Sequence, residues 1–315
     1  MSWFHVMSAL AVAAVGATTI KPADTANPID PAQADQIVLT KEQYERVTVP
    51  VTIKGQGPFR FMVDTGAQAT VVSSQLADQL GLDDRSSAVL VGIASKAAVE
   101  TAMIPEFELG SRSFYIRTAP IVPQENLGGA DGILGLDSLQ GQRVLIDFHK
   151  QRIYVADAKE LGGNSGYEIV VKARRRLGQL IITGARLNGV DTNVIIDTGS
   201  QGSIGNLALL ERLRRTHSLG DNTMTDVNGK TLTAAVRVGR KLEIDNMQMN
   251  NIPIMFADAP PFEALNLVKD PALILGINEL KMFRRVAIDF SNQRVLFDLP
   301  RGTRRQDAMI GAIIS

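Results

Sequence analysis

The sequence contains no cysteine, and this absence excludes several kinds of chemistry. Without a thiol the chain forms no disulfide, binds no metal through thiolates, and uses neither a cysteine nucleophile nor a lipid-anchoring cysteine. Histidine is scarce as well, because only His5, His149 and His217 occur, and their spacing matches no zinc motif. We therefore expect the protein to work with no metal and no cofactor.

Neither sign of charge is in excess, because 33 Lys and Arg residues balance 33 Asp and Glu residues. A chain with no net charge has no general attraction to nucleic acid or to an anionic membrane surface. The basic clusters 174–176 and 214–215 are too short to change this expectation. The length of 315 residues allows two domains and a sizeable core.

Long apolar runs are also absent, apart from one near the N-terminus. Residues 6–17 are apolar and small, but the stretch is too short and too rich in alanine for a transmembrane helix. Val15-Gly16-Ala17 offers small residues for signal peptidase, although no Lys or Arg precedes the run. We expect 1–17 to be a signal peptide or an anchor, 18–46 to be a linker, and the protein to be exported, periplasmic or secreted. Any membrane association would use the N-terminal segment alone.

What the sequence does contain is a repeat. The tripeptide Asp-Thr-Gly occurs first as Asp64-Thr65-Gly66 and again, at an offset of 133, as Asp197-Thr198-Gly199, and an apolar run precedes each copy. Two further elements recur in the same order. The first is 131–136, which recurs as 272–277, and its glycines Gly135 and Gly276 are 141 residues apart. The second is 144–153, which recurs as 286–295 at an offset of 142. Three ordered matches indicate a tandem duplication.

The duplication predicts two similar lobes, 47–160 and 161–300, followed by a C-terminal tail, 301–315, that we expect to be disordered. Glycines and small polar residues at 161–166 mark the boundary between the lobes. Because the offset grows from 133 to 141, the second half carries about eight extra residues between its first two elements.

Short β-like segments dominate both halves. The clearest strands predicted by alternation and β-branching are 47–53, 59–63, 179–183 and 193–196. Helical patterns are scarce, and the two best candidates, 74–82 and 207–215, each follow an Asp-Thr-Gly loop. The predicted fold class is therefore mainly β with short helices.

Asp64 and Asp197 occupy equivalent loops of a duplicated chain, which suggests one shared acid–base pair. One carboxylate can accept a proton from water while a neutral carboxylic acid donates to an amide carbonyl. Two carboxyls held close together cannot both ionise cheaply, so they share one proton. Such a pair can hydrolyse a peptide bond without metal, cysteine or histidine. Asp147 and Asp289 also follow strands but lack the Thr-Gly, and we expect them to be structural.

The two loops and the later apolar-apolar-Gly elements resemble those of the aspartic peptidases. The segment 131–136 is similar to a pepsin segment, while 64–67 and the short lobes are similar to the retroviral type. The resemblance covers about residues 47–298. It implies two retropepsin-like β-barrel lobes in tandem, related by a pseudo-two-fold axis, as in single-chain bacterial aspartyl proteases.

The same resemblance implies that Thr65 and Thr198 brace the two loops, each hydroxyl reaching the backbone of the opposite loop. Gly66 and Gly199 fit tight loops in which a side chain would block close backbone approach.

Four more residues support this predicted site. Gly135 and Gly276 would let an apolar strand pass close behind each loop. Ser200 could hydrogen-bond the carboxylate of its own loop, whereas Ala67 has no hydroxyl to offer. The two carboxyls would then differ in their surroundings.

A hairpin in each lobe would close over a substrate, and we expect these flaps at 89–101 and 223–236. An extended peptide or protein substrate would lie between flap and floor and pair by backbone hydrogen bonds. The residues expected near the tips are Val91, Gly92 and Ile93 in the first flap and Asn228-Gly229, a two-residue hairpin turn, in the second.

Two features of the sequence depart from the patterns of the pepsins and the retroviral enzymes. The first flap has no tyrosine, unlike that of pepsins, and Leu136-Asp137 and Ile277-Asn278 stand where retroviral enzymes usually place arginine.

The sequence predicts an aspartic endopeptidase, active as a monomer, that processes exported or membrane proteins. The alternative is a non-catalytic retropepsin-like module that binds peptides or assembles partners.

Overall fold

The computed structural model describes residues 35–38, 40–41, 47–157, 164, 166–214, 216–300 and 309–311. These residues form a mainly β structure with five short α-helices and one 3-10 helix. The segment 1–17, for which we expect a signal peptide or an anchor, lies outside the described residues. Within the described ranges, no helix combines the length and the apolar composition needed to cross a membrane.

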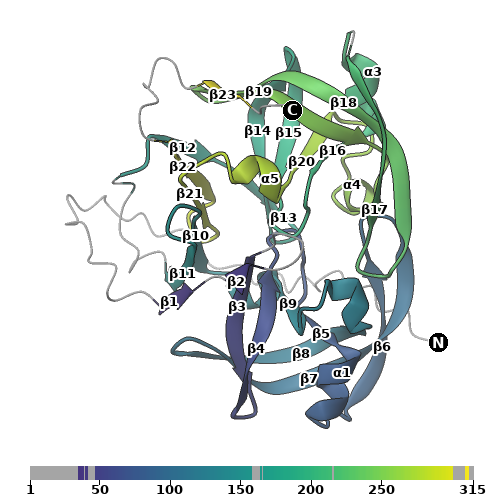
Figure 1. Ribbon diagram of the computed structural model, residues 1–315, viewed down its shortest axis with the longest axis vertical. Helices are drawn as coiled ribbons and strands as arrows, with labels where there is room; N and C mark the ends of the chain where they lie inside the picture. Colours follow the sequence, from purple (N-terminus) through teal and green to yellow (C-terminus); the bar gives the residue numbers. More distant parts are fainter. Residues whose placement is uncertain are drawn as a thin grey trace, which may run out of the picture.

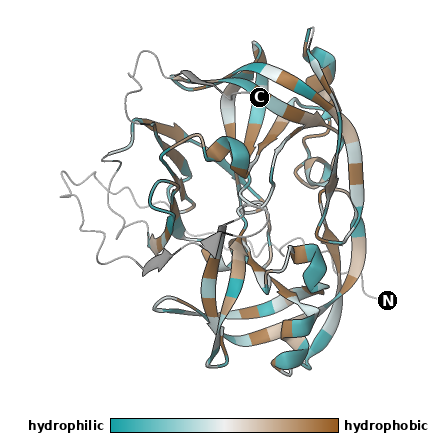
Figure 2. Cartoon of the chain, viewed as in Figure 1, coloured by the Kyte–Doolittle hydropathy of each residue, from teal (hydrophilic) through white to brown (hydrophobic). Residues whose placement is uncertain are grey.

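The first lobe is a β-barrel built on one continuous sheet. Its strands follow the order β2 (Thr40–Lys41), β3 (Val47–Ile53), β4 (Gln56–Val63), β9 (Gly132–Leu134), β5 (Val71–Ser73), β8 (Arg112–Val122), β7 (Lys96–Leu109) and β6 (Arg85–Val91). An additional pairing of β3 with β7 closes six of these strands into the barrel. Polar and apolar residues alternate along many of the strands, so that one side of each strand faces the interior (Figure 2).

The second lobe repeats this architecture. Its strands follow the order β13 (Arg174–Arg176), β14 (Gln179–Leu187), β15 (Val190–Ile196), β20 (Ala272–Leu275), β16 (Ser203–Gly205), β19 (Met247–Phe256), β18 (Thr231–Ile244) and β17 (Ser218–Thr225), and β14 also pairs with β18. The strand register shows that the two lobes correspond residue by residue. Val71 pairs with Ile133 in the first lobe, and their counterparts Ile204 and Ile274 pair in the second. The predicted pair of similar β lobes is confirmed.

A third, six-stranded sheet joins the two lobes (Figure 1). Its order is β1 (Asp35–Val38), β11 (Arg152–Asp157), β10 (Gln142–Asp147), β21 (Arg285–Asp289), β22 (Arg294–Asp298) and β12 (Ile169–Lys172). The third repeated element of the sequence forms its four inner strands. Because β10 and β21 pair antiparallel with Leu145 opposite its own counterpart, Ala287, the pseudo-two-fold axis passes between these two residues.

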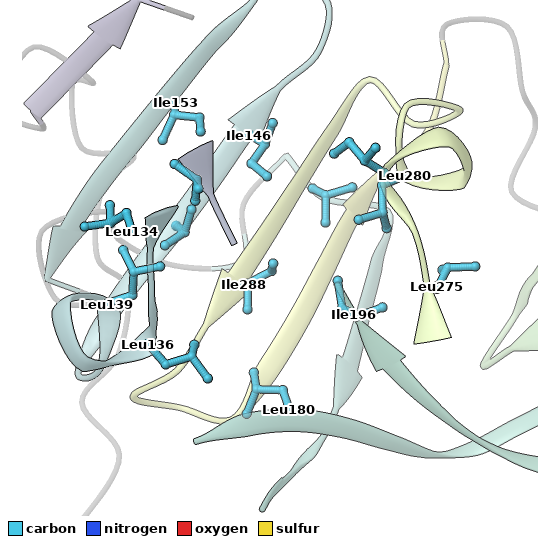
Figure 3. Close-up of a cluster of buried hydrophobic side chains, with 14 of the residues drawn as sticks. Leu134, Leu136, Leu139, Ile146, Ile153, Leu180, Ile196, Leu275, Leu280 and Ile288 are labelled. Carbon is cyan, nitrogen blue, oxygen red and sulfur yellow. The ribbon is translucent and has the colours of Figure 1, made fainter. Parts of the chain in front are cut away.

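One hydrophobic core continues from the joining sheet into both barrels. Figure 3 shows part of it, with Leu134, Ile146 and Ile153 from the first half and Ile196, Leu275 and Ile288 from the second. All six side chains are buried. Burial of apolar surface shared between the halves therefore fixes one lobe relative to the other.

The short helices lie at the ends of barrel strands. They are α1 (Ser74–Gln79), η2 (Gln124–Leu127), α2 (Leu136–Leu139), α3 (Leu207–Arg212), α4 (Pro260–Ala264) and α5 (Ile277–Leu280). Helices α1 and α3 lie where the sequence predicts helices, although each ends earlier than expected. The side chains of Ser73 and Asn206 accept hydrogen bonds from the amides of Leu76 and Leu209, which caps the two N-termini.

Two details of the expected domain division differ from the structure. Strands β1 and β2 lie inside the predicted linker 18–46, where β1 pairs with β11 and β2 pairs with β3. In the predicted disordered tail, β23 (Met309–Gly311) pairs in parallel with β19. Such short edge strands are stabilised by the strand they join rather than by a pattern of their own, so composition alone did not reveal them.

Candidate active site

The two Asp-Thr-Gly loops leave equivalent strands at equivalent positions. Asp64 follows β4 and its amide donates to the carbonyl of Leu134, while Asp197 follows β15 and donates to Leu275, each at 3.1 Å. Within the first loop, Oδ1 of Asp64 accepts from the amides of Gly66 at 2.8 Å and Ala67 at 2.9 Å. Each aspartate is thus fixed by backbone hydrogen bonds on both sides.

The second loop holds its aspartate in the same way. Oδ1 of Asp197 accepts from the amides of Gly199 at 2.8 Å and Ser200 at 3.1 Å. The predicted bond from the Ser200 hydroxyl to this carboxylate is wrong, because that hydroxyl donates to the carbonyl of Gly202 at 2.8 Å. Ala67 and Ser200 therefore do the same work through their amides, and a side-chain hydroxyl is not needed.

The two loops interlock through their threonines. The hydroxyl of Thr65 donates to the carbonyl of Ile196 at 2.9 Å, and that of Thr198 donates to Val63 at 2.7 Å. Each hydroxyl also accepts from the amide of the opposite threonine at 3.1 Å. Both threonines are buried. The mutual bracing implied by the resemblance is therefore the arrangement that the structure has.

Interlocking brings the two carboxyl groups together. A Cβ atom on Gly199 would overlap the carboxylate of Asp64, and one on Gly66 would lie 2.5 Å from Cγ of Asp197. At both positions only glycine leaves room for the opposite aspartate. The neighbour that excludes a side chain is therefore this carboxyl group, and not the backbone of the same loop. The two aspartates thus form one site from two lobes.

The surroundings favour a shared proton. Removal from water raises the pKa of Asp197 well above its ordinary value, and the negative charge of Asp64 raises it further. The amides of Gly199 and Ser200 act in the opposite direction but do not cancel these effects. The pair therefore keeps one proton at pH values where isolated aspartates have lost theirs.

Behind the loops, Gly135 and Gly276 allow the close approach that the sequence predicts. A Cβ on Gly135 would lie 2.5 Å from the carbonyl oxygen of Ala69, and one on Gly276 would lie 2.6 Å from that of Gly202. In α2 and α5, which start here, the amides of Leu136 and Ile277 donate to the carbonyls of the two Asp-Thr-Gly loops.

Sequence reasoning missed two hydroxyl–carboxyl pairs beneath the loops. Thr70 donates to Asp137 at 2.6 Å, and Ser203, its counterpart in the second lobe, donates to Glu279 at 2.6 Å. Burial raises the pKa of both carboxyls, that of Glu279 to about 7, although the hydroxyls oppose the shift. The sequence offered one signal for these pairs: Thr70 and Ser203 are separated by 133 residues, the same offset as the two Asp-Thr-Gly copies.

Comparison with known families agrees with this geometry. The family model described as aspartyl protease matches residues 49–138 and 183–278, once in each lobe and over more than half of the chain. The chain belongs to the aspartyl protease family. No curated protein matches it significantly. The family match covers both aspartates, both threonines and both flap hairpins, so it supports a protease-like function for the whole two-lobed unit.

In this aspartyl protease, the two flap hairpins are β6–β7 and β17–β18, and their tips meet. Gly92 and Ile93 lie in the first tip, directly after Val91, and Asn228 and Gly229 lie in the second. The second tip is a five-residue turn, 226–230, closed by the Asp226 amide on the Lys230 carbonyl, and not the predicted two-residue turn. Gly229 has the left-handed φ of +74° that such a turn requires.

Asp226 joins the two tips. Its Oδ1 accepts from the amides of Asn228 and Lys230 within its own turn, each at 2.9 Å. Its Oδ2 accepts from the tip of the other hairpin, from the amide of Ala94 at 3.2 Å and the hydroxyl of Ser95 at 2.7 Å. The side chain is only 4% exposed. We call these contacts to Ala94 and Ser95 the flap latch.

Each tip also places an apolar residue against the opposite lobe. Ile93 of the first flap packs against the second-lobe cluster that contains Ile204 and Ile274, and Val227 packs against the first-lobe cluster that contains Val71 and Ile133. The two hairpin tips therefore lie over a cleft of about 1000 Å³, which is lined by both Asp64 and Asp197.

The Asp226→Asn variant is expected to open the flap latch. An asparagine that accepts from its own turn presents its NH₂ group to the Ala94 amide, so a donor faces a donor and a charge-assisted bond is lost. Amide exchange at the tips, followed by mass spectrometry, should be faster by about tenfold or more. Exchange in β10 and β21 should not change. Asp221→Asn, an exposed position in β17, is the control, and equal protection in both variants would refute the latch.

Proposed function

We propose that the protein is an aspartic endopeptidase that hydrolyses peptide bonds with water activated between Asp64 and Asp197. The proposal is supported above all by the proximity of the two carboxyl groups. Each lies against the glycine of the opposite interlocked loop, and the charge of Asp64 acts on Asp197. The family match supports protease-like chemistry in general terms.

The reaction needs one proton on the pair. The ionised carboxyl accepts a proton from the water as its oxygen attacks the carbonyl carbon, and the neutral carboxyl donates its proton to the carbonyl oxygen. When the tetrahedral intermediate collapses, the C–N bond breaks and the amine leaves with a proton returned through the pair. The amides that bind Oδ1 of each aspartate hold both groups in orientation throughout.

The substrate that fits this site is an extended peptide. The cleft lies between the crossing flaps and the catalytic loops, and its floor and roof are both built from strands and their turns. Extended backbone can pair with such edges while alternate side chains enter pockets. One chain supplies both aspartates. We propose a monomer as the active unit and exported or membrane proteins as its targets.

Cleavage of a peptide library at a series of pH values tests this function. kcat/KM should fall at low pH, where both carboxyls are protonated, and at high pH, where both are ionised. Because burial and Asp64 raise the pKa of Asp197, the alkaline limb should extend well above the ordinary range of a carboxyl. Peptide binding without cleavage at any pH would instead support the non-catalytic module.

A further inference from the structure

The two halves of the cleft are not equivalent, despite the symmetry of the fold. In the first lobe, Met62, Val71 and Ile133 lie side by side on β4, β5 and β9, and all three line the cleft. Register identifies their counterparts in the second lobe as Ile195, Ile204 and Ile274 on β15, β16 and β20. None of these three isoleucines lines the cleft.

An inserted segment accounts for the difference. The segment 257–271, between β19 and β20, is six residues longer than its counterpart 123–131, between β8 and β9. It holds most of the extra residues that the sequence predicts in the second half, and it includes α4. Phe262 and Leu265, which are 0% and 1% exposed, pack with the three isoleucines and occupy the volume above them.

The same segment also presents its own surface to the substrate side. Pro261, Ala264 and Leu265 line the cleft where the isoleucines would otherwise do so. Glu263 of α4 forms an ion pair with Lys96, at the base of the first flap tip, at 2.6 Å. In the second lobe, the inserted segment therefore covers the surface that corresponds to the first-lobe pocket. We call Pro261, Ala264 and Leu265 the wall, and the ion pair of Glu263 connects this segment to the first flap.

We propose that segment 257–271 makes the protein select side chains by size, with a large apolar side chain bound against the first lobe and a small one against the second. The first-lobe pocket is the part of the cleft lined by Met62, Val71 and Ile133. Its lining is apolar, so a large aliphatic or aromatic group bound there gains from burial. On the second-lobe side, Leu265 and Pro261 meet such a group as a steric obstacle. This inference rests on the proposed function, since it assigns the peptide class that the same cleft takes.

Cleavage-site profiling of the full chain with a peptide library is the first test. Of the positions near the scissile bond, one should prefer large apolar residues and another should prefer small ones, each by about tenfold or more in kcat/KM. Equal acceptance of large apolar residues on both sides of the bond would overturn the proposal.

Two variants assign the positions to the lobes. Leu265→Ala removes part of the wall and should raise cleavage about tenfold for large residues at the small-selective position alone. Ile133→Phe fills the first-lobe pocket and should reduce cleavage of large residues at the other position alone. A change at the same position in both variants, or at neither, would show that the segment does not set this selectivity.

A binding measurement separates this inference from the catalytic proposal. The full-length Asp197→Asn variant, incubated with the same library, should enrich peptides that carry one large and one small apolar residue, without cutting them. Enrichment with no cleavage by the wild type would refute the enzyme and keep the size selection. Cleavage by the wild type with no size preference in either assay would support the enzyme and refute the size selection.

Discussion

Asp197→Asn is expected to lower kcat for peptide hydrolysis by about a thousandfold or more, and Asp64→Asn is expected to do the same. An amide in either place can neither take the proton from water nor share one with the remaining carboxyl. The remaining aspartate is still held by its loop amides, but one group cannot act as base and acid in the same step. Equal losses for both variants follow from a single shared pair.

The control for these variants is Asp191→Asn, an exposed position on β15, the strand that leads to Asp197. It should keep wild-type kcat. Full activity in either single variant of the pair, measured on a peptide that the wild type cuts, would show that the two carboxyls do not act together.

Thermal stability should move in the opposite direction from activity. The pKa of Asp197 is higher in the folded state than in the unfolded state. The protonated carboxyl therefore contributes stability at pH values below the unfolded-state pKa, and this contribution is lost as the pH rises through the folded-state pKa. Asparagine removes this loss. Asp197→Asn should therefore melt higher than the wild type at pH 7, and the difference should shrink towards pH 4. A melting curve recorded beside each assay thus separates loss of chemistry from loss of fold.

The repeat made much of this structure predictable. Because the Asp-Thr-Gly loops, the glycine elements and the Asp-Phe strands recur in order, they identify two equivalent lobes, and the dyad follows from symmetry. The central sheet illustrates this well: Leu145 pairs with Ala287, and both belong to the repeated segment that the sequence shows most clearly.

What escaped prediction is asymmetric. Asp226 joins the flaps from one lobe only, since its counterpart in the other tip is Gly92, whose missing side chain makes room for the Asp226 carboxylate. The offset revealed about eight extra residues in the second half. It did not reveal that six of them lie in 257–271, and the packing of this segment against Ile204 depends on tertiary contacts that no local pattern encodes. Sequence symmetry therefore gives the chemistry of the site, and departures from symmetry give its access and selectivity.

The expectation that Asp289 is structural leads to the largest predicted effect on stability. Its Oδ2 accepts from Nε of Arg143 at 3.1 Å, and a second guanidinium nitrogen contacts the same oxygen. Arg143 and Asp289 are 4% and 0% exposed and lie opposite each other where β10 of the first lobe pairs with β21 of the second. Burial alone would raise the pKa of Asp289, but hydrogen bonds from Asn292 and Arg143 outweigh it and lower the pKa.

Asp289→Ala is therefore expected to reduce the free energy of unfolding by about 3–5 kcal/mol, because a buried guanidinium loses this carboxylate. Asp191→Ala is the matched control. Asp191 also pairs with an arginine, Arg186, but their side chains are 83% and 62% exposed, so the cost should stay below about 1 kcal/mol. Denaturant titration at pH 7 gives both values. The wild-type advantage over Asp289→Ala should fall as pH drops through the lowered pKa of Asp289, since the carboxylate stabilises the fold only when ionised. Similar costs for the two variants would mean that the ion pair does not hold the lobes together, and that the backbone pairing of β10 with β21 and the shared apolar core do so without it.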